Sequence, residues 1–145
     1  MHTSITKDDI VLLPIAVATV AGNCLTFDRL KEALFYVVTE SGIKHRYGYF
    51  IPRVGQLGNS ILIDPEVPKI INRLSKKGMI DVREVEYRDG IEEVYCATEK
   101  GVKRALEVAK KLKNVYGEGE FVNMIVAKAS GGRLSTGKLF LSIND

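Results

Sequence analysis

Cysteine and histidine are scarce in this 145-residue sequence. The two cysteines, Cys24 and Cys96, lie far apart and form no Cys-x-x-Cys pair, so neither a zinc site nor a disulfide framework is supported and reduced thiols are expected. The two histidines are His2 and His45, and no Ser-His-Asp, Cys-His or paired-carboxylate spacing accompanies them. We therefore expect a protein that is not an enzyme and that uses no cofactor or metal ion.

Glycine and proline are not in excess, and no repeat or low-complexity tract occurs, which argues against wholesale disorder and fibrous architectures. A chain of 145 residues can bury a core without metals or disulfides, so one domain over residues 1–145 is expected. Lysine and glutamate are abundant and glutamine occurs once, at Gln56, a bias that thermophile proteins share.

The sequence also lacks a long hydrophobic run. The N-terminus has no basic region followed by an apolar core and a cleavage site, as a signal peptide would. The apolar run from Ile10 to Ala21 is shorter than the roughly 20 residues that cross a bilayer. We expect a cytoplasmic protein without a membrane partner, in which this run forms a buried or a dimer-forming helix.

One glycine-containing stretch, Gly132-Arg-Leu-Ser-Thr-Gly137-Lys138, spells most of a phosphate-binding P-loop. In a true P-loop a Ser or Thr follows the lysine and holds magnesium, whereas Leu139 follows here. Too few residues come after Lys138 for the crossover helix and parallel strand that surround this motif. We interpret the stretch as a surface turn.

Local signals predict an α+β chain in which helices surround a β-hairpin. Thr6 and Asp9 fit a capping box at the start of a helix that runs to Ala21, and Thr26 caps a second helix that ends near Gly42. The other expected elements are a strand over 47–51, a helix over 65–77, hairpin strands over 79–87 and 91–97, a helix over 98–113 and a short apolar helix over 121–129. Residues 53–63 are left open, with Ile61 to Ile63 as either a strand or a last turn of helix, and residues 130–145 receive no assignment.

The helix over 65–77 and the hairpin after it carry the clearest signals. Asp64 is the expected N-cap residue with Pro65 at the first helical position, and Gly78 is the expected stop. Asp-Gly at 89–90 indicates a hairpin turn. A tight two-residue turn there would place Glu86 opposite Glu93, an unfavourable pair of like charges, so we expect a slightly longer turn.

The helix over 65–77 has two chemically different faces. At helical spacing its apolar face contains Val67, Ile70, Ile71 and Leu74. Its other face contains Lys69, Arg73 and Lys76 with Asn72 beside them. Such a helix can pack on a core with one side and meet an anion with the other.

At this point the chain resembles a known family. The stretches RLSKKGMIDV and EYRDGIEEVYCATEKG are similar to winged helix-turn-helix regulators of the MarR and PadR type, over about residues 26–113. In those regulators the recognition helix ends in Leu-x-x-x-Gly-[Leu/Met]-Ile and the second wing strand runs into Thr-Glu-Lys-Gly; here these are Leu74, Gly78, Met79, Ile80 and Thr98 to Gly101. GYFIPRVGQLGNSILI is also similar to small archaeal and bacterial winged-helix proteins of unassigned role, and departs from them at Gln56-Leu57.

The resemblance implies a homodimeric transcription regulator that binds double-stranded DNA. Its implied contacts lie on the recognition helix, at Lys69, Asn72, Arg73, Lys76 and Lys77. Further cations that could widen a phosphate-binding surface are Lys44, Arg46, Arg53 and, at the tip of the wing, Arg88. For the dimer interface we expect the apolar segments 10–21 and 121–129. The basic helix over 98–113 could pack in the dimer or approach DNA.

The wing favours a second hypothesis. Residues 81–93 contain six acidic side chains, Asp81, Glu84, Glu86, Asp89, Glu92 and Glu93, against two arginines, Arg83 and Arg88. Phosphates would repel such a hairpin, so we expect it to stay off a DNA backbone except through Arg88. The alternative function is therefore a winged-helix module that binds another protein through its acidic wing.

Overall fold

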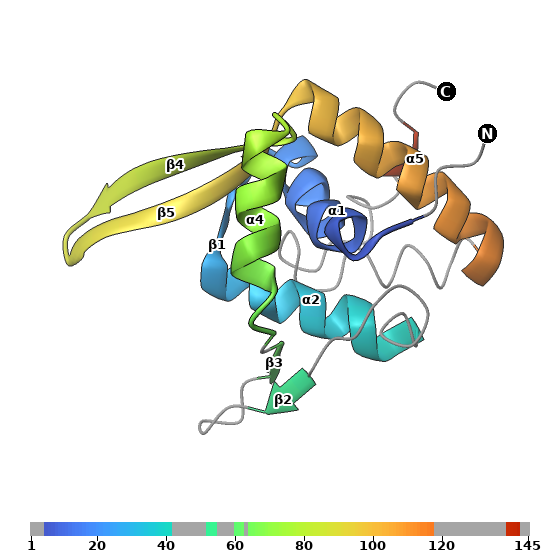
Figure 1. The fold of residues 1–145 in the computed structure, drawn as a ribbon, viewed down its shortest axis with the longest axis horizontal. Helices are drawn as coiled ribbons and strands as arrows, with labels where there is room; N and C mark the ends of the chain where they lie inside the picture. Colours follow the sequence, from blue (N-terminus) through green and yellow to red (C-terminus); the bar gives the residue numbers. More distant parts are fainter. Residues whose placement is uncertain (1–4, 42–51, 55–59, 63, 118–138, 143–145) are drawn as a thin grey trace.

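The computed structural model describes residues 5–41, 52–54, 60–62, 64–117 and 139–142 and shows an α+β chain (Figure 1). The helices and strands, in chain order, are α1 (Lys7–Val20), β1 (Leu25–Thr26), α2 (Phe27–Ser41), β2 (Pro52–Val54), β3 (Ser60–Leu62), α4 (Val67–Lys76), β4 (Ile80–Tyr87), β5 (Gly90–Ala97) and α5 (Glu99–Tyr116). The strand expected over 47–51, the helix expected over 121–129 and the P-loop-like stretch 132–138 lie outside the described residues.

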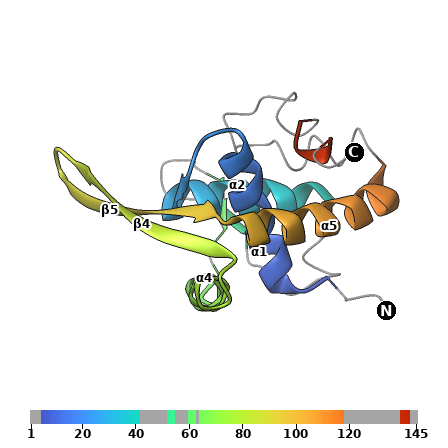
Figure 2. The ribbon, with the colours of Figure 1, turned by 90° about the horizontal axis from the view of Figure 1, so that it is seen from above.

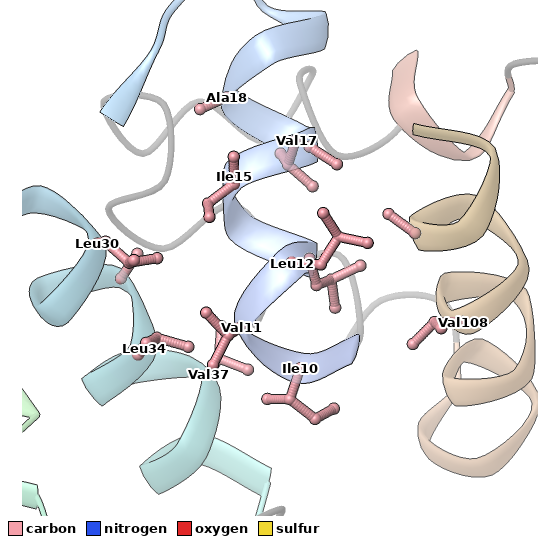
Figure 3. Close-up of a cluster of buried hydrophobic side chains, with 14 of the residues drawn as sticks. Ile10, Val11, Leu12, Ile15, Val17, Ala18, Leu30, Leu34, Val37 and Val108 are labelled. Atoms are coloured by element: carbon pink, nitrogen blue, oxygen red, sulfur yellow. The ribbon is translucent and has the colours of Figure 1, made fainter. Parts of the chain in front are cut away.

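Helix α1 is the centre of the hydrophobic core. Its side chains from Ile10 to Ala18 are buried, and they pack between α2 and α5, with α4 and β5 also in contact (Figure 3). The predicted capping box is confirmed, since Asp9 N–H donates to Thr6 Oγ1 at 3.3 Å and Thr6 N–H donates to Asp9 Oδ2 at 2.9 Å. Of the two alternatives for this run, the buried helix is confirmed. The other alternative, a dimer-forming helix, assumed apolar side chains that the rest of the chain leaves uncovered, whereas these side chains are already covered by the same chain.

Strands β1, β5 and β4 form an antiparallel sheet in that order. The β4–β5 hairpin extends beyond the helices as an arm, with α4 beside its base (Figures 1 and 2). We expected a turn longer than two residues, and this expectation is wrong. The turn has two residues, Arg88 and Asp89, because Tyr87 pairs with Gly90. It lies one residue before the Asp89-Gly90 position considered in the sequence. This register places Glu86 opposite Ile91 and thereby avoids the Glu86–Glu93 pair, but it sets Glu84 opposite Glu93.

A second antiparallel pair, β2 with β3, occupies part of the stretch that the sequence left unassigned. Pro52 pairs with Leu62, Arg53 with Ile61, and Val54 with Ser60. In the order of the chain this pair separates α2 from α4, and both strands contact α2.

The start of α4 differs from the prediction and its end agrees with it. The helix begins at Val67 instead of Pro65, because Asp64 Oδ1 accepts the Glu66 N–H at 2.9 Å and holds residues 64–66 in a turn. At the other end Gly78 has a φ of 74°, and the N–H groups of Gly78 and Met79 bond back to the carbonyls of Ser75 and Leu74 at 3.0 and 2.9 Å. This pair of bonds is a Schellman motif, which needs the left-handed conformation that glycine adopts without strain.

Helix α5 begins at the predicted cap. The Thr98 hydroxyl accepts the Gly101 N–H at 3.1 Å and donates to the Gly78 carbonyl at 2.6 Å, which ties the start of α5 to the end of α4. A Cβ atom at Gly101 would overlap the Met79 carbonyl. The Thr-Glu-Lys-Gly sequence is thus explained by the close packing of two helix ends.

The expectation of reduced thiols is wrong in this structure, where Cys24 and Cys96 form a disulfide with their Cα atoms 4.8 Å apart. Cys24 is exposed in the turn after α1, and Cys96 is buried in β5. The two positions meet because β1, directly after Cys24, pairs with β5 through Leu25 and Tyr95. Proximity in the sheet, which sequence spacing does not reveal, brings the two sulfur atoms together.

Candidate nucleic-acid interface

Helix α4 has the two faces that the sequence predicts. Val67, Ile70, Ile71 and Leu74 are buried, and α4 packs against α1 and β4. Lys69, Asn72, Arg73, Lys76 and, at the C-cap, Lys77 are exposed. In Figure 2 the helix lies at the edge of the molecule, so its outer face is open to a large ligand.

Three consecutive residues at the start of α1 fix the position of α4 and α5. The first of them, Lys7, lies beside the turn that precedes α4, with its Nζ 2.7 Å from Asp64 Oδ2 and 2.8 Å from Glu66 Oε2. Burial alone would lower the pKa of Lys7, but the hydrogen bonds to the two carboxylates outweigh it and raise the pKa. Lys7 therefore joins α1 to the turn before α4 through two ion pairs.

The second residue, Asp8, binds one of the predicted DNA-contacting side chains. Arg73 donates from Nε to Asp8 Oδ2 at 3.0 Å and from Nη2 to Asp8 Oδ1 at 2.8 Å, a two-pronged geometry that arginine forms with carboxylates. These hydrogen bonds lower the pKa of Asp8 and raise that of Arg73. Arg73 is thus engaged within the protein, unlike Lys69, Asn72 and Lys76 on the same helix.

The third residue, Asp9, binds Arg104 of α5. Arg104 donates to both carboxylate oxygens, from Nε at 3.0 Å and from Nη2 at 2.8 Å. Hydrogen bonding to Asp9 is the main cause of the raised pKa of Arg104. The side chains retain only 16% and 10% exposure for Arg104 and Asp9, so Arg104 does not belong to the exposed basic face of α5.

Lys69, Asn72 and Lys76 form the outermost stripe of α4. A helical turn of 100° per residue puts these three opposite the buried face, whereas Arg73 lies on the flank that faces α1. Within the described part of the chain, these three side chains form no hydrogen bond or ion pair. We call these residues the α4 stripe.

The basic surface continues from α4 onto α5, which the sequence alone did not show. Lys100 Nζ donates to the Lys77 carbonyl at 3.0 Å, where the helix dipole of α4 favours a cation. Lys76, Lys77 and Lys100 therefore gather at one place, the C-terminal end of α4. The signal for Lys100 was its position directly after the second hairpin strand, in the Thr-Glu-Lys-Gly start of α5.

Of the other predicted cations, Arg88 is the one whose side chain the structure describes. Lys44 and Arg46 lie outside the described residues, and Arg53 lies on β2, for which the structure describes the backbone only. Arg88 is exposed in the turn between β4 and β5, at the tip of the arm. The structure thus groups Lys69, Asn72, Arg73, Lys76 and Lys77 and leaves Arg88 apart from them.

The acidic side chains of the hairpin are exposed, as predicted, and the register sorts them by face. Residues directly opposite share a face and successive residues alternate, so one face contains Val82, Glu84, Glu86, Ile91 and Glu93. The opposite face contains Asp81, Arg83, Val85, Tyr87 and Glu92. Arg83 lies 3.8 Å from Asp81 on that second face, whereas the first face contains no arginine or lysine.

Three further observations bear on function. In the described residues no group of three or more His, Cys, Asp or Glu side chains could hold a metal ion. No helix in the described ranges has both the length and the apolar character that a membrane span requires. Searches against protein-family models, curated proteins and solved structures find no match to this chain.

Proposed function

We propose that this protein binds double-stranded DNA as a winged helix-turn-helix regulator, with α4 as the recognition helix. The observation that carries the proposal is the exposed, cationic α4 stripe on a helix followed directly by a β-hairpin. The chain order is α1, β1, α2, β2, β3, α4, β4, β5, and the sheet order is β1-β5-β4. The position of α4 directly before the hairpin supports the proposal, because a winged helix presents its recognition helix just before the wing. The β2–β3 pair takes the place of the short turn that joins the two helices of a simple helix-turn-helix.

The α4 stripe has the chemistry that a groove-binding helix requires. Lys69 and Lys76 supply cations for phosphate oxygens, and Lys77 and Lys100 extend this charge at the end of the helix. Asn72, between the two lysines of the stripe, is the residue type that bonds adenine in the major groove with two hydrogen bonds. Arg73 contributes by orienting α4 through Asp8 instead of contacting DNA.

The arm contributes to DNA binding through its tip alone. Its carboxylates would approach the phosphates on either side of the groove, which is unfavourable at the short distances of such contacts. Arg88 is exposed in the turn at the tip of the arm, where its charge favours contact with a phosphate. We thus infer that the affinity for DNA comes mainly from α4, with little contribution from the arm.

The proposal includes a homodimer and a cytoplasmic location. A disulfide in an intracellular protein is unusual except in hyperthermophiles, whose cytosolic proteins are rich in them. The abundance of lysine and glutamate is consistent with such a source.

The test is binding to a labelled pool of random duplex DNA, measured by fluorescence anisotropy across a salt series. Each phosphate contact adds about 0.9 to the slope of log affinity against log salt, so Lys69→Gln/Lys76→Gln is expected to reduce the slope by about 1.8. Lys110→Gln/Lys111→Gln removes the same charge from α5, several turns away from α4, and is expected to leave the slope nearly unchanged. Equal effects of the two double variants, or no binding at low salt, would refute the proposal.

A second candidate function is binding of a protein through the acidic hairpin. The observation that favours it is the face with Glu84, Glu86 and Glu93, which projects from the body of the molecule together with exposed apolar side chains.

A further inference from the structure

The exposed large apolar side chains of the described residues gather on the β4–β5 hairpin. Val82 is 39% exposed, Tyr87 is 51% exposed and Ile91 is 66% exposed; the other such residue in the described ranges is Leu139. Both sides of the arm are open to solvent, since it extends beyond the helices in two perpendicular views (Figures 1 and 2). Apolar groups gathered on a projecting element are typical of an interaction surface.

Two of these side chains, Val82 and Ile91, share a face with three carboxylates. We call Val82, Glu84, Glu86, Ile91 and Glu93 the arm face. It continues the core side of the sheet, because the next pairs toward the body on this face include Tyr95 and Ile80, which belong to the hydrophobic core cluster. Glu93 lies two residues before Tyr95 on the same face of β5, at the edge of the core. Burial, and then the charge of Glu93, raise the pKa of the Tyr95 hydroxyl.

The arm face is unfavourable in an isolated chain. Glu84 and Glu93 lie directly opposite each other in the antiparallel ladder, where like charges destabilise the pair. In the described part of the chain no cation forms an ion pair with Glu84, Glu86 or Glu93. A ligand that brings cations to this face would remove the repulsion and cover Val82 and Ile91.

The same chain presents a surface of the matching charge. The α4 stripe contains Lys69 and Lys76, again without an ion pair in the described residues, and Lys77 and Lys100 lie next to it. Within one molecule the arm extends away from α4, so its outer part does not cover the stripe (Figure 2). A second copy can supply the cations that the arm face lacks.

We infer that the arm face binds the α4 stripe of a second copy of this chain. The contact is reciprocal, with each arm lying on the recognition helix of the other molecule, and a two-fold axis closes the pair. This deepens the second candidate function by naming the partner. It also differs from the dimer interface expected on segment 10–21, whose side chains from Ile10 to Ala18 are inside the core, whereas the segment expected over 121–129 lies outside the described residues.

Reciprocal pairing has a consequence for DNA binding. Lys69 and Lys76 would serve both the partner's arm and the DNA phosphates, so the self-associated form and the DNA-bound form exclude each other. The homodimer is then the DNA-free form, and DNA is bound by the dissociated chain instead of by the homodimer that the family resemblance implies. This consequence rests on the proposed function, whereas self-association itself does not.

The experiment is sedimentation velocity of the full chain without nucleic acid, at about 0.1 M and about 1 M salt, between which the Debye length shortens from about 10 Å to about 3 Å. We expect a dimer at low salt and a monomer at high salt. Glu84→Gln/Glu93→Gln removes two charges from the arm face and is expected to raise the dissociation constant at least roughly tenfold. Asp81→Asn/Glu92→Gln removes two charges from the opposite face and is expected to change it less than about twofold.

A charge exchange decides whether arm and stripe touch each other. Glu84→Lys/Glu93→Lys and Lys69→Glu/Lys76→Glu are each expected to be monomeric alone, because both contacts of each pair then repel. Their equimolar mixture is expected to form a dimer, because both contacts are attractive again. A monomeric wild type at low salt, a dimer that resists Glu84→Gln/Glu93→Gln, or a mixture that stays monomeric would overturn the inference. None of these results depends on DNA. The anisotropy titration tests the DNA proposal separately when the protein concentration is kept below the dissociation constant of the pair, where the α4 stripe is uncovered.

Discussion

Reduction of the Cys24–Cys96 disulfide should lower the stability of the fold by an amount that follows from its position. The bond joins residues 72 apart in sequence, and closing a loop of this length removes about 15 cal/mol/K of entropy from the unfolded chain. At 25 °C this corresponds to about 4 kcal/mol of stability. A chain of 145 residues has an unfolding entropy of about 0.3 kcal/mol/K, so the melting temperature should fall by roughly 13 °C.

The assay is thermal unfolding followed by circular dichroism, with and without a phosphine reductant, while alkylation and mass spectrometry record the state of both cysteines. Because Cys24 is exposed, a reductant can reach the bond in the folded protein. Cys24→Ser provides the control, since its melting temperature should be insensitive to the reductant and close to that of the reduced wild type. Equal melting temperatures for the oxidised and reduced wild type would refute the entropy reasoning, and two alkylated cysteines without reductant would refute the bond itself.

Two further predictions concern the ion pairs at the start of α1. Because the pKa of Asp8 is lowered in the folded state, its pair with Arg73 stabilises the fold above the unfolded pKa of about 3.9, and this stability is lost as the pH falls through the lower folded pKa. In urea unfolding, the wild type should therefore be more stable than Asp8→Asn near neutral pH and equally stable in strong acid. A difference in stability that persists in strong acid would contradict this assignment. Arg104→Met leaves Asp9 buried without its partner and should cost about 3 kcal/mol, the low end for a broken buried pair because both side chains keep some exposure, whereas Glu107→Gln, which removes the exposed second partner of Arg104, should cost less than about 1 kcal/mol in the same assay.

The ends of the helices could be predicted from the sequence because they depend on neighbouring residues. The capping box of Thr6 and Asp9, the glycine stop at Gly78 and the Thr98 cap all involve groups within a few positions of one another. The start of α4 shows the limit of such signals, because Asp64 can cap a helix or a turn and here it holds a turn. The hairpin and its two strands were predicted, but the register was not, and the expectation of a longer turn was wrong.

The residues of the candidate site were mostly predicted, whereas their contacts with other parts of the chain were not. Amphipathic spacing alone showed which side chains of α4 face outward, and the structure leaves Lys69, Asn72 and Lys76 exposed. The engagement of Arg73 by Asp8 joins residues 65 apart in sequence, and no local pattern marks it. The addition of Lys100 likewise required the end of α4 to meet the start of α5.

Side-chain type and a spacing of 2 or 3.6 residues suffice to predict the α+β class, the outward face of α4 and the acidic character of the hairpin. The groups that meet across long separations are known from the folded chain alone: Arg104 with Asp9 over 95 positions, Cys24 with Cys96 over 72, and Glu84 with Glu93 through the hairpin register. Short-range steric and capping preferences depend on adjacent residues, so they can be read along the chain. Contacts between elements are instead set by how the whole core packs around α1.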